Sequence, residues 1–408
     1  MDTRHKEARV CIAGGGPAGI MLGYLLARAG ISVIVLEKWP DFFRDFRGDT
    51  IHPSTMDALA ELGLLDEFLA LPHSEMARMS LTVGPDEVAV ADFSHLPTRA
   101  RFIAFIPQWD FLNFLATKAA AFPAFTLLMA TDATGLIRDE SGRITGITAR
   151  DADGAFDISA DLVIGADGRH STMRDALGAK VAALGVPIDV LWFRIDRHDA
   201  DTRESLAYTE AGGALVMLDR HDYWQCGFII EKGAFDAIKA AGLDAFRSSI
   251  ATLAKLPQGA LAGIESWDDV KLLSVAVDHV SPWAADGILL IGDAAHAMSP
   301  VGGVGINYAI ADAIGAANIL VPALRAKKGA LPLATLNAVE ARRAPAALRM
   351  QKLQVLLQDR FLAPILRAKK GVRMPLPFRF LAWFPILRRI PARVIGLGFR
   401  PEHIEIDF

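Results

Sequence analysis

A glycine-rich turn near the start of the chain has the residue types and spacing that bind a nucleotide pyrophosphate. The stretch GGGPAG matches G-x-G-x-x-G directly after an apolar run and at the start of an apolar helix. In such a turn Gly14 allows the tight bend, Gly16 lets the backbone approach a pyrophosphate, and Gly19 lets the helix pack closely on the strand. The helix start, with Pro17 and Ala18, then offers N–H groups and the positive end of its dipole to the phosphates.

A carboxylate follows this turn at the distance that ribose binding requires. Glu37 closes the apolar run Ser32–Leu36, about 20 residues after the turn, where it can accept hydrogen bonds from a ribose. The next residue, Lys38, is included in the candidate cofactor site. An acid here disfavours a 2′-phosphate, so the slot fits FAD or NAD better than NADP. The alternative is a tight structural turn with a solvated Glu37.

Two further motifs lie far down the chain, whereas an NAD-dependent dehydrogenase needs only the first. Residues 161–174 (DLVIGADGRHSTMR) form a strand that ends in Asp167-Gly168, followed by a helix start. Residues 288–296 (ILLIGDAAH) contain Gly292-Asp293, and the glycine-rich stretch 300–307 (PVGGVGIN) follows. The additional motifs favour FAD over NAD as the bound cofactor.

The three motifs, in this order and at this spacing, resemble the class A flavoprotein monooxygenases, the family typified by para-hydroxybenzoate hydroxylase. The resemblance covers about residues 8–345. It implies an α/β fold: a Rossmann-like FAD-binding domain, an inserted antiparallel β-sheet substrate domain and a helical C-terminal part. It also implies tightly bound FAD, NADPH or NADH as a transient reductant, and O2. In that family a flavin hydroperoxide hydroxylates an aromatic or polyketide-like small molecule.

The same resemblance assigns roles around the flavin. Asp293 lies next to the ribityl and pyrophosphate portion, and Gly292 allows close approach. The residues placed at the flavin ring are Gly303, Gly305, Ile306 and Asn307. Backbone N–H groups at the start of their helix would stabilise the negative charge of a reduced flavin. Pro300 bounds the pocket near the reacting flavin carbon, and is a candidate catalytic residue.

Four other residues are candidates, and three of them have a second interpretation. Arg47 reaches the FAD phosphates or ribityl chain, or is a surface arginine. Gln108 contacts FAD at the start of a helix. Asp167 holds the loop beside the pyrophosphate, or only caps a helix. His52 is a candidate acid or base, or a satisfied structural histidine. No general base is assigned.

The elements that must position these residues can be read from hydrophobic periodicity. The predicted strands and helices of the nucleotide-binding part are strand Val10–Ala13, helix Ala18–Ala29, strand Ser32–Leu36, helix Ser54–Leu65, helix Trp109–Ala121, strand Asp161–Ala166, strand Gly287–Ile291 and helix Gly305–Leu320. The first three form a β-α-β unit and imply a parallel sheet. Alternating runs from about Pro187 to Ile230 predict an antiparallel sheet with one covered face.

These runs divide the chain into interleaved segments. The FAD-binding domain is predicted over residues 1–72, 107–180 and 281–345, the substrate domain over 73–106 and 181–280, and a helical basic C-terminal region over 346–408. Aromatic and sulfur-containing side chains of the inserted sheet are the candidate substrate pocket: Trp192, Met217, Tyr223, Trp224 and Phe228. Alternating aromatics on a strand can equally be plain core.

Composition excludes several classes of protein. The 408 residues are 52% hydrophobic and 22% charged, with a net charge of −4, which argues against a nucleic-acid binder. Two scattered cysteines, Cys11 and Cys226, form no disulfide framework, so a cytoplasmic location is expected. We predict no metal site and no transmembrane helix. Nothing in the sequence sets the oligomeric state.

The C-terminal region has an unusual charge. From Arg342 to Arg400 there are 14 Lys and Arg residues against one acid, Asp359, interleaved with aromatic residues and prolines. One interpretation is a peripheral surface that touches an anionic membrane. The other, which we favour, is a helical cap on the FAD-binding domain.

Two other functions are compatible with the same motifs. One is a flavin-dependent dehydrogenase or reductase of the same fold, acting on a lipophilic substrate without oxygen transfer. The other is a flavoprotein that only binds or senses a ligand. Fold-level resemblance does not name a substrate.

Overall fold

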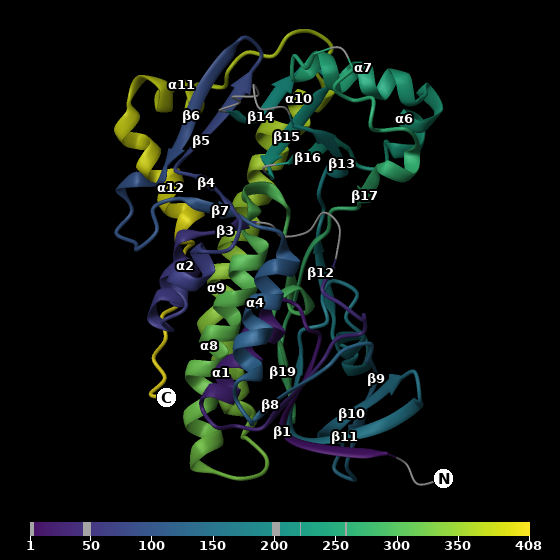
Figure 1. The fold of residues 1–408 in the computed structure, drawn as a ribbon, viewed down its shortest axis with the longest axis vertical. Helices are drawn as coiled ribbons and strands as arrows, with labels where there is room; N and C mark the ends of the chain where they lie inside the picture. The colour runs from purple at the N-terminus through teal and green to yellow at the C-terminus, as the bar shows by residue number, and fades with distance from the viewer. Residues whose placement is uncertain (1–3, 44–49, 198–204, 221, 258) are drawn as a thin grey trace.

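The computed structural model describes residues 4–43, 50–197, 205–220, 222–257 and 259–408. It contains two principal sheets, one at each end of an elongated molecule, with two long helices running between them (Figure 1). The predicted fold class, a Rossmann-like domain with a second β-sheet and a helical C-terminal part, is confirmed.

The first sheet has a parallel core built from the apolar runs of the β-α-β unit. Its central strand β1 (His5–Ala13) lies between β2 (Val33–Leu36) and β11 (Gly154–Gly165). The sheet continues with β8 (Phe125–Leu128) beside β2 and with β20 (Ile288–Leu290) beside β11. Every residue of β2 and β20 is buried, which explains why these runs are apolar throughout rather than alternating.

Antiparallel strands extend this sheet. β10 (Ile144–Asp151) pairs with the first half of β11 and with β9 (Asp132–Arg138). At the edge, β19 (Ala284–Ala285) pairs with β20.

Three helices stack side by side next to the parallel strands. α1 (Pro17–Arg28) packs between α4 (Gln108–Ala120) and α8 (Gly305–Ala326), as Figure 1 shows. The stretch Val301–Ala326 is long and apolar enough to cross a membrane, but 78% of its most apolar window is buried inside the protein. Burial in the core therefore accounts for its composition.

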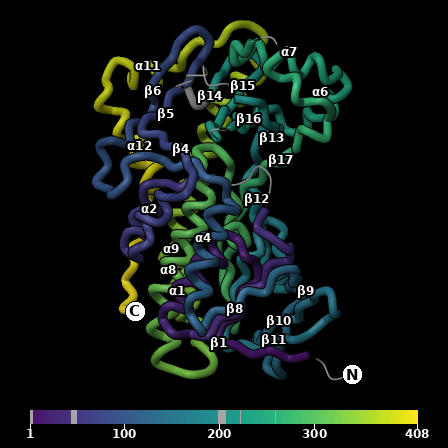
Figure 2. The backbone as a smooth tube through the Cα atoms, viewed as in Figure 1, coloured from purple at the N-terminus to yellow at the C-terminus, as the bar shows by residue number. Residues whose placement is uncertain are grey.

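The second sheet has seven strands in the order β17-β13-β16-β15-β14-β5-β6. Its strands are β5 (Arg78–Val83), β6 (Asp86–Asp92), β13 (Ile188–Asp196), β14 (Ser205–Glu210), β15 (Gly213–Asp219), β16 (Tyr223–Glu231) and β17 (Lys271–Leu273). All neighbours are antiparallel except β5 and β14. Figure 2 shows the early blue segment and the later teal segment of the chain meeting in this sheet.

One face of the second sheet is covered by α6 (Phe235–Ala241) and α7 (Leu243–Leu253). The ring of Phe246 on α7 meets two rings from the strands, with centroid distances of 5.6 Å to Phe193 and 5.9 Å to Phe228. These contacts form a core separate from that of the first sheet.

Two small three-stranded sheets join the large ones. One contains β3 (Thr50–Ile51), β4 (Ser74–Met76) and β7 (Ile103–Phe105); the other contains β12 (Val181–Leu184), β18 (Val277–Val280) and β21 (His296–Ala297).

The helix predicted over Ser54–Leu65 is shorter and begins earlier. α2 (Pro53–Glu61) starts with proline in its first turn after His52, not from a Ser54 cap, because proline suits the first helical position. It ends before Gly63, whose φ of +74° is left-handed and stops the helix. A separate short helix, α3 (Leu65–Leu69), follows.

The C-terminal helices pack on both parts of the molecule. α9 (Leu333–Leu357) and a π-helical turn lead into α10 (Ala363–Arg367), α11 (Leu376–Trp383) and α12 (Arg389–Gly396). α11 and α12 contact β6, where their apolar side chains enter the core around Phe93. The favoured expectation of a cap on the FAD-binding domain agrees with the packing of α9 on α8, whereas α11 and α12 lie on β6. The last residues of the chain then run back to α8 and α2, where His403 O accepts from Asn318 and Ile404 N donates to Glu61.

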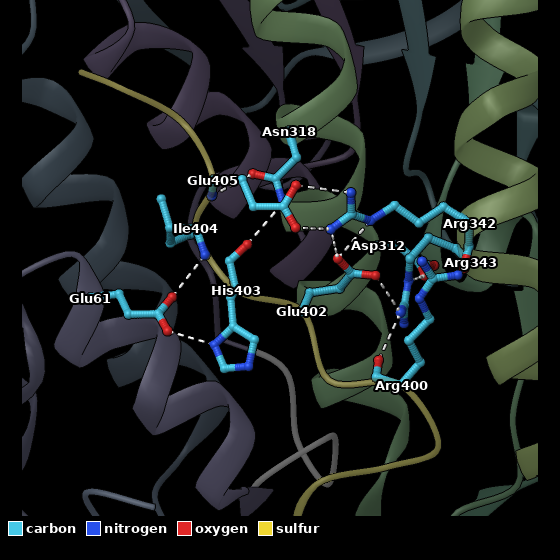
Figure 3. Close-up of polar contacts among 10 residues, drawn as sticks. All are labelled: Glu61, Asp312, Asn318, Arg342, Arg343, Arg400, Glu402, His403, Ile404 and Glu405. Carbon is cyan, nitrogen blue, oxygen red and sulfur yellow. Dashed lines mark hydrogen bonds and ion pairs between the residues drawn. The ribbon is translucent and has the colours of Figure 1, made fainter.

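That return is held by an ion-pair network around one buried carboxylate (Figure 3). Asp312 on α8 accepts a hydrogen bond from Arg343 Nε on α9 at 2.9 Å, and Arg343 Nη1 donates to Glu402 at 3.0 Å. Arg342 donates to both Glu402 and Glu405. Burial opposes ionisation of Asp312, but His296 and Arg343 together hold the pKa of its carboxyl below the usual value. The network fastens the end of the chain to the two long helices.

Replacing Arg343 by Met should therefore destabilise the fold strongly. Arg343→Met leaves the carboxylates of Asp312 and Glu402 buried without their shared cation, for which we expect a loss of about 3–5 kcal/mol in the free energy of unfolding. Urea denaturation followed by circular dichroism measures it. Arg342→Met is the matched control: Glu402 stays paired with Arg343, so the loss should be below about 1 kcal/mol. Equal losses in the two variants would contradict this account.

Candidate active site

The three motifs converge because the strands before them are parallel neighbours. β1, β11 and β20 end together at Ala13, Gly165 and Leu290. Beyond the strands, Ala166 N donates to Ala13 O at 2.8 Å, and Ile291 N donates to Gly165 O at 2.9 Å. The carboxyl edge of the sheet thus holds the Asp167-Gly168 motif between the glycine turn and the Gly292-Asp293 motif, and this edge is the position where open α/β sheets bind ligands.

The glycines of the first turn are required for different reasons. Gly14 has a left-handed φ of +105°, and a methyl group there would clash with the carbonyl of Ala166. A methyl group on Gly19 would clash with the carbonyl of Gly14. Gly16 faces open space, with no atom of the described residues within 4 Å of a methyl group built on it. Because no side chain in the described part of the chain caps α1 either, the helix start is open to a phosphate.

Glu37 lies over this turn. Its carboxylate accepts hydrogen bonds from Gly15 N at 3.2 Å and from Trp39 N at 3.1 Å. The carboxylate is therefore held at the end of β2, beside the opening at Gly16. Lys38 is exposed, with its ammonium 5.7 Å from the centre of the Trp39 ring.

Asp167 caps the helix that follows it. Its carboxylate accepts from Ser171 Oγ at 2.5 Å and from Met173 N at 3.0 Å, at the start of α5 (Thr172–Leu177). Burial raises the pKa of Asp167, against the effect of these hydrogen bonds. The capping role that the sequence left open is thus present, and it holds the Asp167-Gly168 loop next to Gly14.

The third motif connects the sheet edge to the buried carboxylate. Gly292 N donates to Asp312 Oδ2 at 3.1 Å, and His296 Nε2 lies 2.6 Å from the same oxygen. A methyl group on Gly292 would stand 3.3 Å from the Cβ of Ala18, so the motif packs against the start of α1. Asp293 is partly exposed, with its carboxylate 3.9 Å from Arg169 Nε.

The stretch 300–307 is fixed by Asn307. Its amide nitrogen donates to Thr50 O at 2.9 Å and to Gly303 O at 3.2 Å, and its oxygen accepts from His52 N and Thr55 Oγ1. These four hydrogen bonds use the hydrogen-bonding capacity of the side chain. Thr50 Oγ1 also donates to Gly303 O at 2.8 Å. Asn307 therefore positions the loop, while Gly305 and Ile306 begin α8 with no side-chain cap from the described residues.

The remaining cofactor candidates are Pro300, Gln108 and Arg47. Pro300 is partly exposed at the start of this loop. Gln108 is the first residue of α4 and is half-buried. Arg47 lies outside the described residues. In the described part of the chain, no group of three or more His, Cys, Asp or Glu side chains is arranged to hold a metal ion.

His52 is fully enclosed and contacts the C-terminal region. Its Nδ1 lies 2.8 Å from the carbonyl oxygen of Ile395 on α12. Burial lowers the pKa of the imidazole to about 4, which the hydrogen bond to Ile395 only partly offsets. The ring is therefore neutral at pH 7.

The two faces of the second sheet separate the candidate pocket residues. Trp192, Gly227 and Val216 are directly paired across three strands, so their side chains share one face. That face contacts Val301 of the loop after Pro300, together with Leu362 and Leu366. The alternate residues Met217, Trp224 and Phe228 instead lie in the core under α7.

Of the pocket candidates, Tyr223 and Trp192 therefore lie on the face of the sheet that contacts the loop at Val301. Tyr223 is half-buried, with the guanidinium of Arg194 4.3 Å from its ring centre. The sequence missed Gln225 and Arg220, which are buried on or next to this face and are joined by a hydrogen bond of 3.1 Å. It also missed Thr50 and Asp312. An acid in the otherwise apolar helix α8 was a signal of a buried partner.

The neutral state of His52 predicts an acid-dependent loss of stability. In the unfolded chain a histidine takes up a proton below about pH 6.5, whereas His52 in the fold resists it until about pH 4. Stability from this group is present above pH 6.5 and falls as the pH drops towards 4, by about 2 kcal/mol between pH 7 and pH 5. His52→Asn, which can still donate to Ile395 O, should lose less stability over that interval in urea titrations. Parallel pH profiles for the two proteins would rule this out.

Comparison with known proteins identifies the family. A family model described as an FAD binding domain matches residues 7–352. The 6-methylpretetramide 4-monooxygenase of Streptomyces rimosus is 32% identical over an alignment of 396 residues that covers 95% of this chain and 93% of that protein.

Solved structures share the fold at lower identity. PqsL of Pseudomonas aeruginosa, a probable FAD-dependent monooxygenase, aligns with a TM-score of 0.74 at 22% identity over 88% of this chain and 97% of its own. The p-nitrophenol 4-monooxygenase PnpA of Pseudomonas putida aligns with a TM-score of 0.76 at 18% identity over 97% of this chain and 100% of its own. With the three motifs gathered at one sheet edge, these matches show that the chain belongs to the FAD-binding-domain flavoproteins, as an FAD-dependent monooxygenase of class A.

Proposed function

We propose that this monooxygenase uses NADPH or NADH and O2 to hydroxylate an aromatic or polyketide-like small molecule. The observation that carries the proposal is the apolar face of the second sheet at Trp192 and Val216, which contacts Val301 just after Pro300. The substrate named in the Streptomyces rimosus relative supports the same class, because that relative aligns along 93% of its length.

The cofactor fits the open positions of the first turn. A pyrophosphate over Gly16 would receive the N–H groups at the start of α1, and Glu37 is held where it can accept hydrogen bonds from a ribose. Asp293 and Gln108 lie near the remaining length of FAD, and we keep Arg47 in this set from the sequence. When bound, FAD supplies the reduction of O2 and the oxygen transfer, while the protein supplies orientation and electrostatics.

The stretch 300–307 is proposed to hold the flavin ring. Asn307 and Thr50 tie Gly303 in place, so the uncapped start of α8 presents its N–H groups in a fixed direction. The positive end of this helix would stabilise negative charge on the reduced ring. His52, neutral and bonded to Ile395 O, acts in positioning β3 and α12 rather than in proton transfer.

Substrate is proposed to lie between this loop and the sheet face of Trp192. The indole of Trp192 packs over Gly227, where a larger residue would displace it. An apolar surface with polar groups at Arg220, Gln225 and Tyr223 suits a planar aromatic molecule that carries a few oxygens. The same apolar lining excludes water from the reacting atoms.

The cytoplasm is proposed as the location. Cys11 and Cys226 are both buried and neither forms a disulfide, which is the usual state of cysteines in a reducing compartment.

Oxygen dependence tests the proposed reaction. Purified holoenzyme with NADPH or NADH and a panel of polycyclic phenols should consume O2 and yield a product one oxygen atom heavier, labelled when the gas is ¹⁸O2. Product that forms equally well without O2 would instead indicate the dehydrogenase or reductase function. FAD content measured by absorbance in the same samples separates loss of the cofactor from absence of the right substrate.

Gly16 provides a sharper test of the cofactor position. Its φ of −74° suits any residue and its side-chain direction is open, so Gly16→Ala should leave the stability of the FAD-free protein unchanged. The added methyl group would meet the pyrophosphate, at a cost of about 1–3 kcal/mol, or about fivefold to 150-fold in FAD affinity. Isothermal titration with FAD measures the change.

The matched control is Gly135→Ala, which also adds a methyl group in open space, but on β9. It should alter neither FAD affinity nor stability. If Gly16→Ala binds FAD as tightly as the control does, the pyrophosphate does not lie at this turn.

A further inference from the structure

An exposed apolar patch covers the outer side of the C-terminal helices. It consists of Leu376, Phe380, Trp383, Phe384, Ile386 and Ile390 on α11, α12 and the turn between them. The exposed fraction of these residues runs from 48% at Phe380 to 66% at Ile386. Scattered exposed apolar residues are ordinary, but six large ones within fifteen residues are not.

The patch belongs to a packed element. The inner sides of the same helices bury Ala392 and partly bury Phe378 and Leu381 against the core around Phe93. On the outer side the ring of Phe380 meets Trp383 at 5.7 Å and Phe384 at 6.5 Å between centroids. The helices therefore have two apolar sides, and only the inner one is covered. Figure 1 shows them at the outer edge of the second sheet.

The chain segment that carries the patch has charged residues of a single sign. Residues 360–401 contain ten Lys and Arg and no Asp or Glu, although the whole chain has a net charge of −4. Arg379 places its guanidinium 5.0 Å from the Trp383 ring centre, and Arg389 and Arg393 are exposed on α12. Apolar and aromatic side chains rimmed by arginines form the arrangement that binds the interface of an anionic bilayer.

We propose that this patch docks the enzyme on an anionic lipid surface. Trp383, Phe384 and Ile386 enter the boundary between headgroups and acyl chains, and the arginines remain at the phosphates. A second copy of the chain is the weaker occupant, because a two-fold interface would bring two strongly basic segments together. The proposal concerns where the enzyme sits and is independent of its substrate.

Vesicle sedimentation of the holoenzyme tests this. Vesicles that contain phosphatidylglycerol should sediment the protein at about 0.05 M salt, at least tenfold more strongly than vesicles of phosphatidylcholine alone and more strongly than at about 0.5 M salt. The double variant Trp383→Ser/Ile386→Ser should lose about tenfold or more of this binding. The double variant Arg389→Glu/Arg393→Glu should lose binding to the anionic vesicles as well.

The control is Leu272→Ser/Leu356→Ser, which removes two leucines that are 46% and 51% exposed outside the patch. It should sediment as the parent protein does, and bound FAD and urea denaturation should show that all variants fold. Absence of sedimentation with anionic vesicles at low salt would overturn the proposal. So would unchanged sedimentation of the Trp383→Ser/Ile386→Ser variant, or a dimer in light scattering that this variant converts to monomer.

Discussion

The carboxylate of Asp312 is the interaction on which the arrangement of the site depends. It is fully buried on α8, and it binds at once the backbone N–H of Gly292, the imidazole of His296 and the guanidinium of Arg343. A buried charge is tolerated only when such partners surround it. The Gly-Asp motif at the sheet edge is thereby held to the helix whose start is proposed to face the flavin. Through Glu402 the same network reaches the end of the chain, so parts of the sequence that are far apart share one polar centre (Figure 3).

A second constraint is the division of the inserted sheet into two faces. Because side chains alternate along a strand, each strand supplies both the core under α7 and the surface toward the loop after Pro300. Phe193 and Met217 lie in the core under α7, and Trp192 and Val216 lie on the surface toward the loop. The core under α7 supports the sheet from one side, so the opposite face presents a packed surface to the loop after Pro300.

The C-terminal helices pack on the outer edge of the second sheet and connect it to the residues around the loop 300–307. α12 contacts the core around Phe93 through Ala392, while its Ile395 carbonyl binds the imidazole of His52. His52 in turn donates its backbone N–H to Asn307, which holds the loop at Gly303. One chain of contacts therefore leads from the outer helices to the proposed flavin site. The apolar patch lies at the far end of that chain, on the side that faces solvent.

The sequence alone determined the features that arise within a few residues of each other. The turn at Gly14 to Gly19, the buried strands and the two later glycine-aspartate motifs each combine a local backbone requirement with a local apolar pattern, and together they indicated the family and its cofactor. The sequence did not determine which face of each strand is turned toward the site. The core residues Met217, Trp224 and Phe228 could therefore not be distinguished from Trp192, which lies on the opposite face. The sequence also did not reveal the partners of Asp312 or the position of α11 and α12 on the second sheet. Those features depend on contacts between residues tens to hundreds of positions apart, which only the packed tertiary structure decides.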